Sequence, residues 1–425
     1  MNRIIIPVLI IWMAVCTSQA QIRMSVQDCR EMALANSHDI RISTLEYNKA
    51  VKDWQTARTA FLPELSGSAT YAYLFKDMEM GMGMNISMKG MYMAGITIQQ
   101  PIYAGGRIVN GNKMAKTGVA ISEQNARLAR INTLVEVEQA YWMYVSVNEK
   151  VRLLQQYTAL LDTLLLHVNN LYEVQMATTQ DIQQVRTRQS NIRYELQRAE
   201  SGLELTRMSL CHLTGLDLHT PIIASDTVIT VKKPNDPYSP AIDNRPELQM
   251  LQMQVRLKEL EIKNTRAGFL PAIGLSAGYQ HMGGMKFAGS SVKMNMPLVM
   301  ASISIPIFHF GEGTKKIRSA RIAHEISLAE LNKNRSLMDI EAQQAHSAYQ
   351  SAYLLIGTAE EGLIQAVENL RLVQNRYEMR MATIVDVMEA QTQWQEAYSN
   401  DIEARTNYRV KEVEYWKASG TESLK

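Results

Sequence analysis

The segment Phe61–Tyr71 reads FLPELSGSATY, and Phe269–Tyr279 repeats it as FLPAIGLSAGY. A second motif, YEVQMATTQD at Tyr172–Asp181, returns as YEMRMATIVD at Tyr377–Asp386. Self-similarity over so long a period indicates a duplicated structural unit. Because neither copy carries a cluster of catalytic side chains, we expect the duplication to build an architecture rather than an active site.

The spacing between the copies divides the chain. The second motif recurs after 205 residues, as does the Pro-Ile-aromatic segment that begins at Pro101, whereas the first motif recurs after 208. The difference in length therefore falls between Pro63 and Pro101, inside a loop. We expect a signal peptide at 1–20, a first structural repeat at 21–215, a linker at 216–244 and a second repeat at 245–425.

Composition and the N-terminus narrow the class of protein. The 425-residue chain has a net charge of +2, which gives no reason to expect a nucleic-acid partner. Its start has the pattern of a secretory signal, with Arg3, an apolar run and a small-residue cleavage site ending at Ala20. Cys16 suggests a lipoprotein signal, but Val15 before it is larger than such sites usually carry. We therefore expect export with cleavage after Ala20.

Proline is absent from two stretches, 102–220 and 307–425, which are rich in helix-forming residues. Each stretch is divided once by a Thr-x-x-Asp capping box, at Thr178 and Thr383. At about 1.5 Å per residue, the longest helices would reach on the order of 100 Å and must pack side by side. The pattern predicts helices at about 25–59, 107–173, 178–214, 245–268, 312–378 and 383–419.

Strands are expected where apolar and polar residues alternate between the paired prolines. Such alternation is typical of membrane-barrel strands and also of a soluble sandwich sheet. No uninterrupted apolar run of about 18 residues occurs in the mature chain, so we expect no helical membrane span. Four strands leave open edges that lipid does not tolerate, so strands crossing a membrane must be pooled from several chains. The predicted strands lie at about 65–77, 91–103, 273–283 and 297–309.

No motif for catalysis or for a bound cofactor is present. The histidines lack the spacing of a zinc site, and no glycine-rich phosphate loop occurs. We predict no enzymatic activity and no cofactor. Cys29 and Cys211, the two cysteines of the mature chain, either form a bridge in an oxidising compartment or remain as two half-buried free thiols.

Taken in order and in duplicate behind a signal peptide, these segments resemble the TolC-like outer-membrane efflux proteins over essentially the whole mature chain. The residues that carry the resemblance are the Phe-Leu-Pro strand openings, PIYAGGR at 101–107, NRPEL at 244–248 and the two Tyr-Glu-x-x-Met-Ala-Thr-x-x-Asp motifs. The resemblance implies an α+β membrane protein that forms a homotrimer. Each chain would contribute four strands to a 12-stranded outer-membrane barrel, continued by a long α-helical barrel in the periplasm.

The resemblance also implies the function. Members of the family are exit ducts of tripartite multidrug efflux pumps or type I secretion systems in the cell outer membrane. They are joined by a periplasmic adaptor protein to an inner-membrane pump. The alternative is a soluble periplasmic coiled-coil scaffold or adaptor, which explains the long helices but not the two strand pairs.

In that family the helix-hairpin tips close the periplasmic entrance and dock the adaptor. By the resemblance, Asp181, Asp386 and Glu389 would present acidic rings there, and Tyr172 and Tyr377 would tether the closed tips. Two other interpretations stay open, because both aspartates fit helix caps and both tyrosines fit ordinary packing. The adaptor would contact the tip residues Val174, Gln175, Met176, Met379 and Met381.

The tips also depart from the family pattern. Such tips usually carry a glycine that allows a positive φ in the turn, and this chain has Gln175 and Arg380 instead. The turn geometry and the choice of adaptor are therefore open. Arg380 is a candidate to pair with an acidic tip residue, and Gln184 stands where the second copy has Glu389.

The loop between the first two strands is crowded with methionine. Thioether sulfur suits Cu(I) and Ag(I), which makes copper or silver efflux an alternative within the channel interpretation. Methionine is also a flexible filler at adaptable surfaces. The methionines of this loop region are Met78, Met80, Met82, Met84, Met88, Met91 and Met93.

Overall fold

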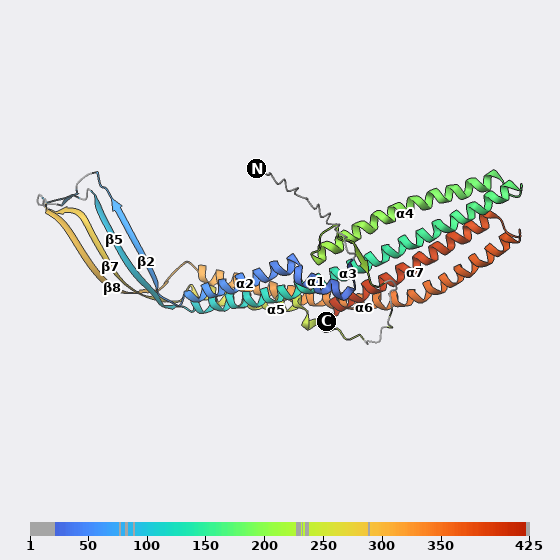
Figure 1. The fold of residues 1–425 in the computed structure, drawn as a ribbon. Coiled ribbons are helices and arrows are strands. Elements are labelled where there is room, and N and C mark those ends of the chain that lie inside the picture. Colours follow the sequence, from blue (N-terminus) through green and yellow to red (C-terminus); the bar gives the residue numbers. More distant parts are fainter. Residues whose placement is uncertain are drawn as a thin grey trace, which may run out of the picture.

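The molecule is elongated, with a β-sheet at one end, side-by-side helices in the middle and two helical hairpins at the other end (Figure 1). The predicted signal peptide at 1–20, with Cys16, lies outside the described residues, as do the side chains of 76–89 in the methionine-rich loop. The computed structural model describes residues 22–75, 78–80, 84–87, 90–226, 231, 233, 238–287 and 290–421.

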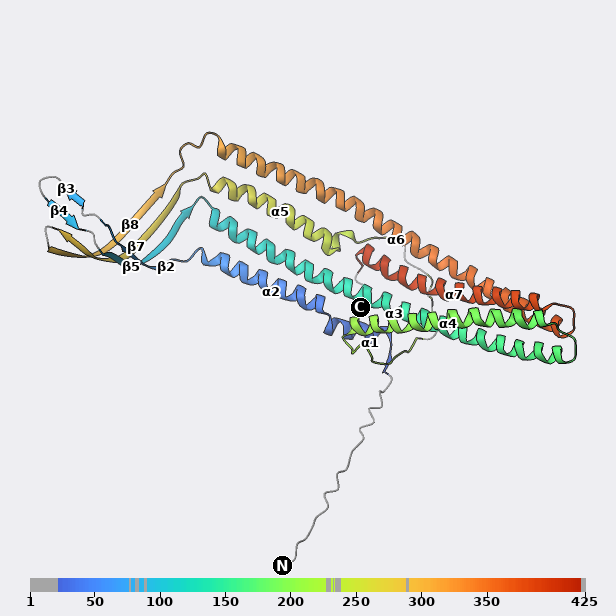
Figure 2. The same cartoon turned by 90° about the horizontal axis from the view of Figure 1, so that it is seen from above.

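Two helices of 67 residues run through most of the length, α3 at Arg107–Glu173 and α6 at Glu312–Glu378. At about 1.5 Å per residue each reaches on the order of 100 Å, which only lateral packing can stabilise. Near the sheet, α2 and α5 lie beside them, and toward the far end α4 and α7 do so (Figures 1 and 2). These shorter helices span His38–Thr59 (α2), Pro246–Ala267 (α5), Thr179–Thr214 (α4) and Ile384–Ser419 (α7).

The chain opens with two helices rather than the single helix predicted at 25–59. Helix α1 spans Val26–Asn36, and α2 begins at His38. Ser37 between them has φ −59° and ψ 127°, outside the helical region, and its Oγ accepts a hydrogen bond from the backbone N–H of Ile40 at 3.4 Å. A serine that caps one helix in this way also ends the helix before it.

Four main antiparallel strands form the sheet in the order β2–β5–β7–β8. They span Glu64–Ala72 (β2), Met91–Ala104 (β5), Ala272–Phe287 (β7) and Ser290–Ser304 (β8). Two short strands extend the outer end, where β4 pairs with β7; they are Met78–Met80 (β3) and Met84–Ser87 (β4).

The first and last strands differ from the predicted bounds. Strand β2 ends at Ala72 rather than 77, because its partner β5 begins opposite, at Met91. Strand β8 starts at Ser290 rather than 297, since Pro297 sits within an edge strand, where a missing N–H breaks no ladder when it points outward. The same strand stops at Ser304 rather than 309, just before Pro306.

The two faces of the sheet carry different side chains. Directly opposed residues project to the same face, as Ile96 and Tyr279 do on one side and Ser68 and Gly95 on the other. Among the described residues no helix covers either face. The apolar face carries Ile96, Ile98, Leu275, Tyr279, Val299 and Ile303, and the polar face carries Ser66, Ser68, Thr97, Ser276, Gln280 and Ser302.

The segment 216–244, predicted as a linker, holds secondary structure of its own. Strand β6 at Ile222–Ala224 pairs in parallel with β1 at Ile22–Met24, and a 3₁₀ turn follows at Ile242–Asn244. The hydroxyl of Tyr144 on α3 donates to the Ile222 carbonyl at 2.5 Å, which fixes this small sheet to the long helix. Strands of three residues are too short to show an alternating pattern in the sequence.

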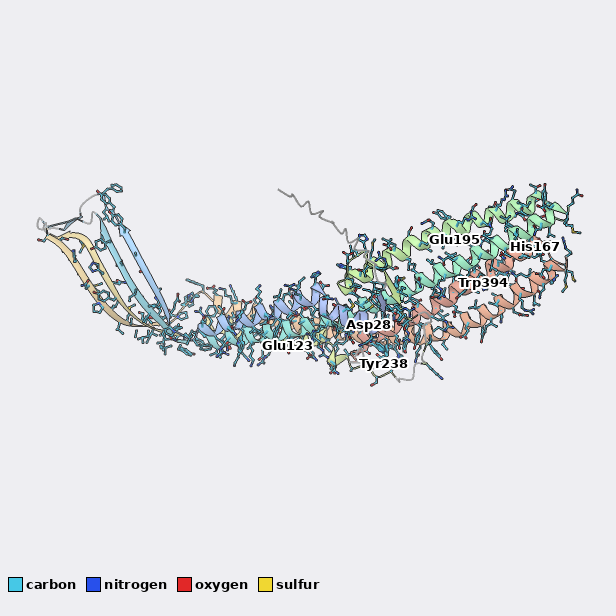
Figure 3. All side chains as sticks on the ribbon, viewed as in Figure 1. Asp28, Glu123, His167, Glu195, Tyr238 and Trp394 are labelled. Atoms are coloured by element: carbon cyan, nitrogen blue, oxygen red, sulfur yellow. The ribbon has the colours of Figure 1, made fainter. Side chains whose placement is uncertain are left out.

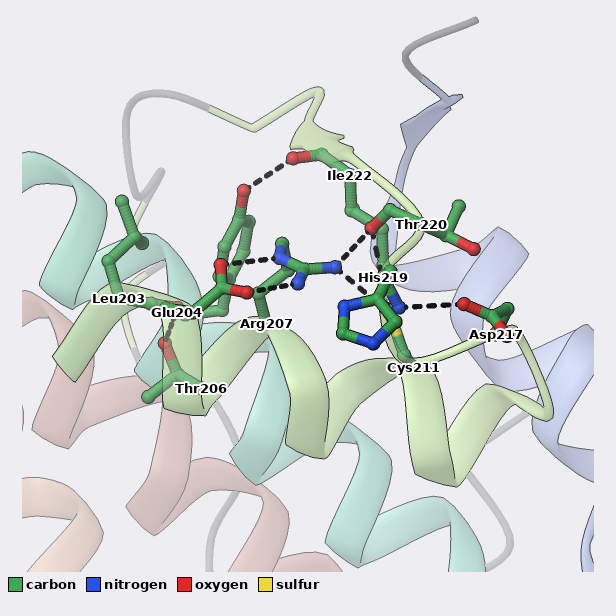
Figure 4. A network of polar contacts seen from close by, with 10 residues as sticks. Leu203, Glu204, Thr206, Arg207, Cys211, Asp217, His219, Thr220 and Ile222 are labelled. Carbon is green, nitrogen blue, oxygen red and sulfur yellow. Dashed lines mark hydrogen bonds and ion pairs between the residues drawn. The ribbon is translucent and has the colours of Figure 1, made fainter. Parts of the chain in front are cut away.

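An arginine on α4 fastens the same segment (Figure 4). Arg207 donates to the carboxylate of Glu204 and to the backbone carbonyl of Thr220. Cys29 and Cys211 are both fully buried in the adjoining core cluster and both are free thiols, so the structure realises the thiol alternative rather than the bridge. In the described ranges, no helix has an apolar stretch long enough to cross a membrane.

Candidate functional site at the hairpin tips

The two hairpin turns are built alike. At the end of α3, the Met176 N–H donates to the Leu171 carbonyl at 2.7 Å and the Gln175 N–H to the Tyr172 carbonyl at 2.9 Å. This pair of hydrogen bonds is the Schellman motif, which satisfies the last carbonyls of a helix. The end of α6 repeats it, with Met381 donating to Arg376 at 2.7 Å and Arg380 to Tyr377 at 3.0 Å.

The central residue of each turn has a positive φ although neither is glycine. Gln175 has φ 61° and Arg380 has φ 64°. The sequence alone does not decide whether a left-handed turn forms at these positions. The structure shows that it forms without glycine. A side chain in this conformation places Cβ close to the next carbonyl oxygen, which costs roughly 1–2 kcal/mol.

The two aspartates act as helix caps. Thr178 Oγ1 and the Thr178 N–H both donate to Asp181 Oδ2 at 2.8 Å, and the Asp181 N–H donates back to Thr178 Oγ1 at 3.2 Å. Thr383 and Asp386 form the same box at the start of α7. The hydrogen bonds from the backbone and side chain of Thr383 hold the pKa of Asp386 below its ordinary value.

Asp386 still faces outward while serving as a cap. It is exposed, as is Glu389 three residues further along the same helix, whereas Ile384 and Val387 are buried against the first hairpin. The Gln393 amide donates to Glu389 at 3.4 Å. The exposed face of α7 thus presents two carboxylates one turn apart, whereas on α4 both Asp181 and the uncharged Gln184 are half-buried.

The tips of the two hairpins contact one another. In the described part of the chain, the partner of Arg380 is Met176 of the other tip, whose sulfur accepts from Nη2 at 3.2 Å. Within this chain Arg380 therefore contacts a thioether, and its pairing with an acidic tip residue stays a prediction. A guanidinium–thioether contact is weaker than an ion pair, because the sulfur carries no charge.

Only one of the two tip tyrosines packs between the hairpins. The ring of Tyr377 meets His167 of α3 edge-on, with ring centroids 5.7 Å apart, and burial raises its pKa, as does the nearby Asp181. Tyr172 is 47% exposed. Figure 3 labels His167 and Trp394 at this end of the molecule.

A second junction, one that the sequence did not reveal, ties three helices together deeper in the hairpins. Arg188 of α4 donates from Nε to the Tyr157 hydroxyl of α3 at 3.0 Å and from Nη2 to Thr392 Oγ1 of α7 at 3.1 Å. Tyr157 is fully buried, and its ring meets Trp394 edge-on. The three partners lie far apart in sequence, so no local pattern indicates them.

The residues predicted to dock an adaptor form the outermost surface of the tips. Each of the apolar ones is more than half exposed, a costly arrangement for a monomer in water. Across the described ranges, no group of three or more His, Cys, Asp or Glu side chains is arranged to hold a metal ion. The exposed apolar tip residues are Val174, Met176, Met379 and Met381, with polar Gln175 exposed among them.

Comparisons with known proteins agree with this architecture. The chain matches the family described as Outer membrane efflux protein over residues 29–216 and again over 238–421. It is 24% identical to outer membrane protein OprJ of Pseudomonas aeruginosa over 411 residues, covering 92% of this chain and 82% of OprJ. It is 22% identical to the toluene efflux pump outer membrane protein TtgC of Pseudomonas putida over 414 residues, covering 93% and 83%.

A solved structure shares the fold. The outer membrane channel CmeC of Campylobacter jejuni superimposes with a TM-score of 0.81 at 18% sequence identity, covering 93% of this chain and 85% of CmeC.

Proposed function

The chain belongs to the outer membrane efflux protein family, and we propose that it is the trimeric exit channel of a tripartite efflux pump or of a type I secretion system. Membership of the family confirms the resemblance drawn from the repeated motifs. It also places the chain in the outer membrane, with its helices in the periplasm. The alternative of a soluble periplasmic scaffold is thereby set aside.

The observation that carries the proposal is an uncovered sheet mounted on helices about 100 Å long. One face of the sheet is apolar, the other carries hydroxyl and amide side chains among methionines, and no helix covers either one in the described residues. A sheet of this kind is stable where lipid lies against one face and water against the other. The helices are long enough to extend well into the periplasm.

The edges of the sheet support a trimer. Strands β2 and β8 each leave one row of backbone groups unpaired, and in lipid each such group costs several kcal/mol. The two edge strands run in opposite directions, so β8 of one copy can pair with β2 of the next in the antiparallel manner. Three chains closing in this way would give a barrel of 12 strands, four from each chain.

The gate of the proposed channel lies at the hairpin tips. An adaptor that docks on the exposed Val174, Met176, Met379 and Met381 would separate the two hairpins, which Arg380, Tyr377 and Arg188 now hold together. Asp386 and Glu389 of the three chains would then line the entrance with carboxylates. Such a ring favours cations at a narrow opening.

Planar-bilayer recording tests both the channel and the ring. The double variant Asp386→Asn, Glu389→Gln keeps shape and hydrogen-bonding capacity but removes both charges. We expect its cation preference to fall while the channel still conducts. A matched control, Glu195→Gln with Glu200→Gln, removes two exposed charges further along α4 and should leave the preference unchanged.

The two outcomes that count against the proposal are distinct. Unchanged cation preference in the Asp386, Glu389 variant would refute the acidic ring alone. A purified wild-type protein that inserts into the bilayer but never conducts would refute the channel itself.

A further inference from the structure

The polar face of the sheet changes character toward its outer end. On β2, β5 and β7 near the helices it carries hydroxyl, amide and glycine residues, as in the row formed by Ser66, Thr97 and Gly278, while β8 adds Leu298 and Met300. Further out, the residues opposite one another on three neighbouring strands are all methionines. Met93 of β5 pairs with Met282 of β7, and Met282 pairs with Met294 of β8.

The register places these methionines on one face. Residues directly opposed across antiparallel strands project to the same side, so Met93, Met282 and Met294 form a single line, here called the methionine row. Residues two positions along a strand share a face too, which adds Met91 of β5 and Met296 of β8 beside the row. Met91 lies on the outer side of the row and Met296 on its inner side, so each adds one thioether next to an end of the row.

Filling a core does not explain the row. In the described residues no element packs over this face, so there is no irregular gap for flexible side chains to fill. Met294 is 41% exposed, and Met93 and Met282 are half-buried. Leu298 and Met300 of β8 also lie on this face, but their partners on β7 are Gly278 and Ser276, whereas the row joins three thioethers on neighbouring strands. The row has no packing reason, and its sulfur atoms offer a chemical one.

The spacing allows several methionines to bind one metal ion. Neighbouring strands lie about 4.8 Å apart, so the sulfur of Met282 stands between two others within the reach of one unbranched side chain. Soft thioether sulfur selects Cu(I), and Ag(I) shares that preference, over the hard divalent ions. Thioethers are neutral, so the bound ion keeps its single positive charge, and this face of the sheet is open to water, which can solvate that charge.

We propose that the methionine row, Met93, Met282 and Met294, binds a soft monovalent cation, Cu(I) or Ag(I), on the polar face of the sheet, with Met91 and Met296 as neighbouring ligands. The site follows from the strand register. It stands whether or not the hairpin tips form an acidic gate.

Titration of the full-length protein in detergent with Ag(I) alone tests the site, because Ag(I) is inert to oxidation. Competition against a thioether chelator gives the affinity, and ¹³C-methyl methionine spectra report which methionines respond. We expect the methyl signals of the row to shift together. The triple variant Met93→Leu, Met282→Leu, Met294→Leu keeps the apolar volume. Its loss of ligands should weaken binding at this site by at least about tenfold.

A matched control replaces three exposed methionines that stand apart from one another, Met143, Met300 and Met381, each by leucine. It should bind Ag(I) as the wild type does, with the same methyl shifts. The proposal is overturned if Ag(I) leaves the row's methyl signals in place, or if the row variant binds as tightly and in the same amount as the control. A circular-dichroism melt of both variants guards against comparing a misfolded protein.

Discussion

Gln175 and Arg380 occupy a backbone conformation in which almost any side chain is strained, yet both hairpins adopt it. The turn is imposed from both sides, by the Schellman hydrogen bonds that end one helix and by the capping box that starts the next. A residue whose neighbours fix its φ in this way retains the strain, which therefore lowers the stability of the tip. At Arg380 the contact of the side chain with Met176 offsets part of this strain.

Replacing Gln175 by glycine should stabilise the first tip. Glycine adopts φ 61° without a Cβ clash, so local opening of the turn should become less favourable by about 1 kcal/mol. Hydrogen exchange of the Met176 amide, which closes the Schellman motif, should slow by roughly fivefold. Gln175→Val serves as the opposite control, since a β-branched residue raises the strain and should speed exchange. Equal or faster exchange in the glycine variant would contradict the strain.

The environment of Cys29 changes the reactivity of its thiol, which can be measured. Burial, with smaller contributions from Asp28, Asp226 and Cys211, raises its thiol pKa to about 12 from an ordinary 9.0. Only the thiolate reacts, so at about pH 8 iodoacetamide should leave Cys29 unmodified in the folded protein. Because the folded pKa is raised, the contribution of this thiol to stability is complete below 9.0 and is lost as the pH rises toward 12.

Mass spectrometry after iodoacetamide treatment checks this expectation. In guanidinium the same cysteine should react fully, and a Ser190→Cys variant, exposed on α4, should react quickly without denaturant. Full modification of Cys29 in the folded protein within the time taken by Ser190→Cys would show that the thiol is accessible.

At the scale of elements, the two hairpins are joined by a buried apolar cluster that includes Ile384 and Val387 of α7. Two polar contacts add to it, Arg380 with Met176 at the tip and the junction of Tyr157, Arg188 and Thr392 further along. The junction holds better, because it combines two hydrogen bonds to a guanidinium with a buried aromatic ring. Opening the hairpins requires that this junction break.

Thr392→Val removes the junction's hydroxyl while keeping the shape of the side chain. A hydrogen bond to a charged group contributes about 1.5 kcal/mol or more, so the balance between closed and open tips should shift toward open by roughly tenfold. In bilayer recordings this shift appears as a larger fraction of time in the conducting state. Thr187→Val is the control, since the Thr187 hydroxyl donates to the Gln183 carbonyl of its own helix at 2.8 Å. Equal open times in the two variants would exclude the junction as a constraint on opening.

The elements differ in how far the sequence predicts them. The long helices are found at the predicted residues, because proline-free runs and the capping boxes at Thr178 and Thr383 are local signals. The sequence does not predict the break at Ser37, because a serine within a helical run does not show whether its hydroxyl will cap a new helix. The pairing of β1 with β6 and the Tyr157–Arg188–Thr392 junction were missed for another reason: both join residues distant in sequence.

At the scale of the whole molecule, we propose that several copies of the chain assemble. Its sheet ends in two unpaired edges, β2 and β8, and its long helices leave many apolar side chains exposed, among them Leu354, Ile364 and Leu166. Exposed edges and apolar patches of this extent are normally covered by another chain. Closure by β2-to-β8 pairing accounts for the edges with one repeated contact, and a repeated head-to-tail contact that closes gives a ring.

Disulfide cross-linking can test that contact. In a background with Cys29→Ala and Cys211→Ala, Ser68→Cys on β2 is combined in turn with Met296→Cys, Leu298→Cys, Met300→Cys or Ser302→Cys on β8. The series is needed because the strands of a closed barrel are staggered. At least one combination should give a non-reducing gel ladder that ends at three chains, since each bond joins one copy to the next and the third closes the ring.

A pair within the chain, Thr97→Cys with Gly278→Cys, lies directly opposed and should give only single chains. A ladder ending at two chains, continuing past three, or absent from every combination would refute the closed trimer, since each of these requires a different contact between the edges.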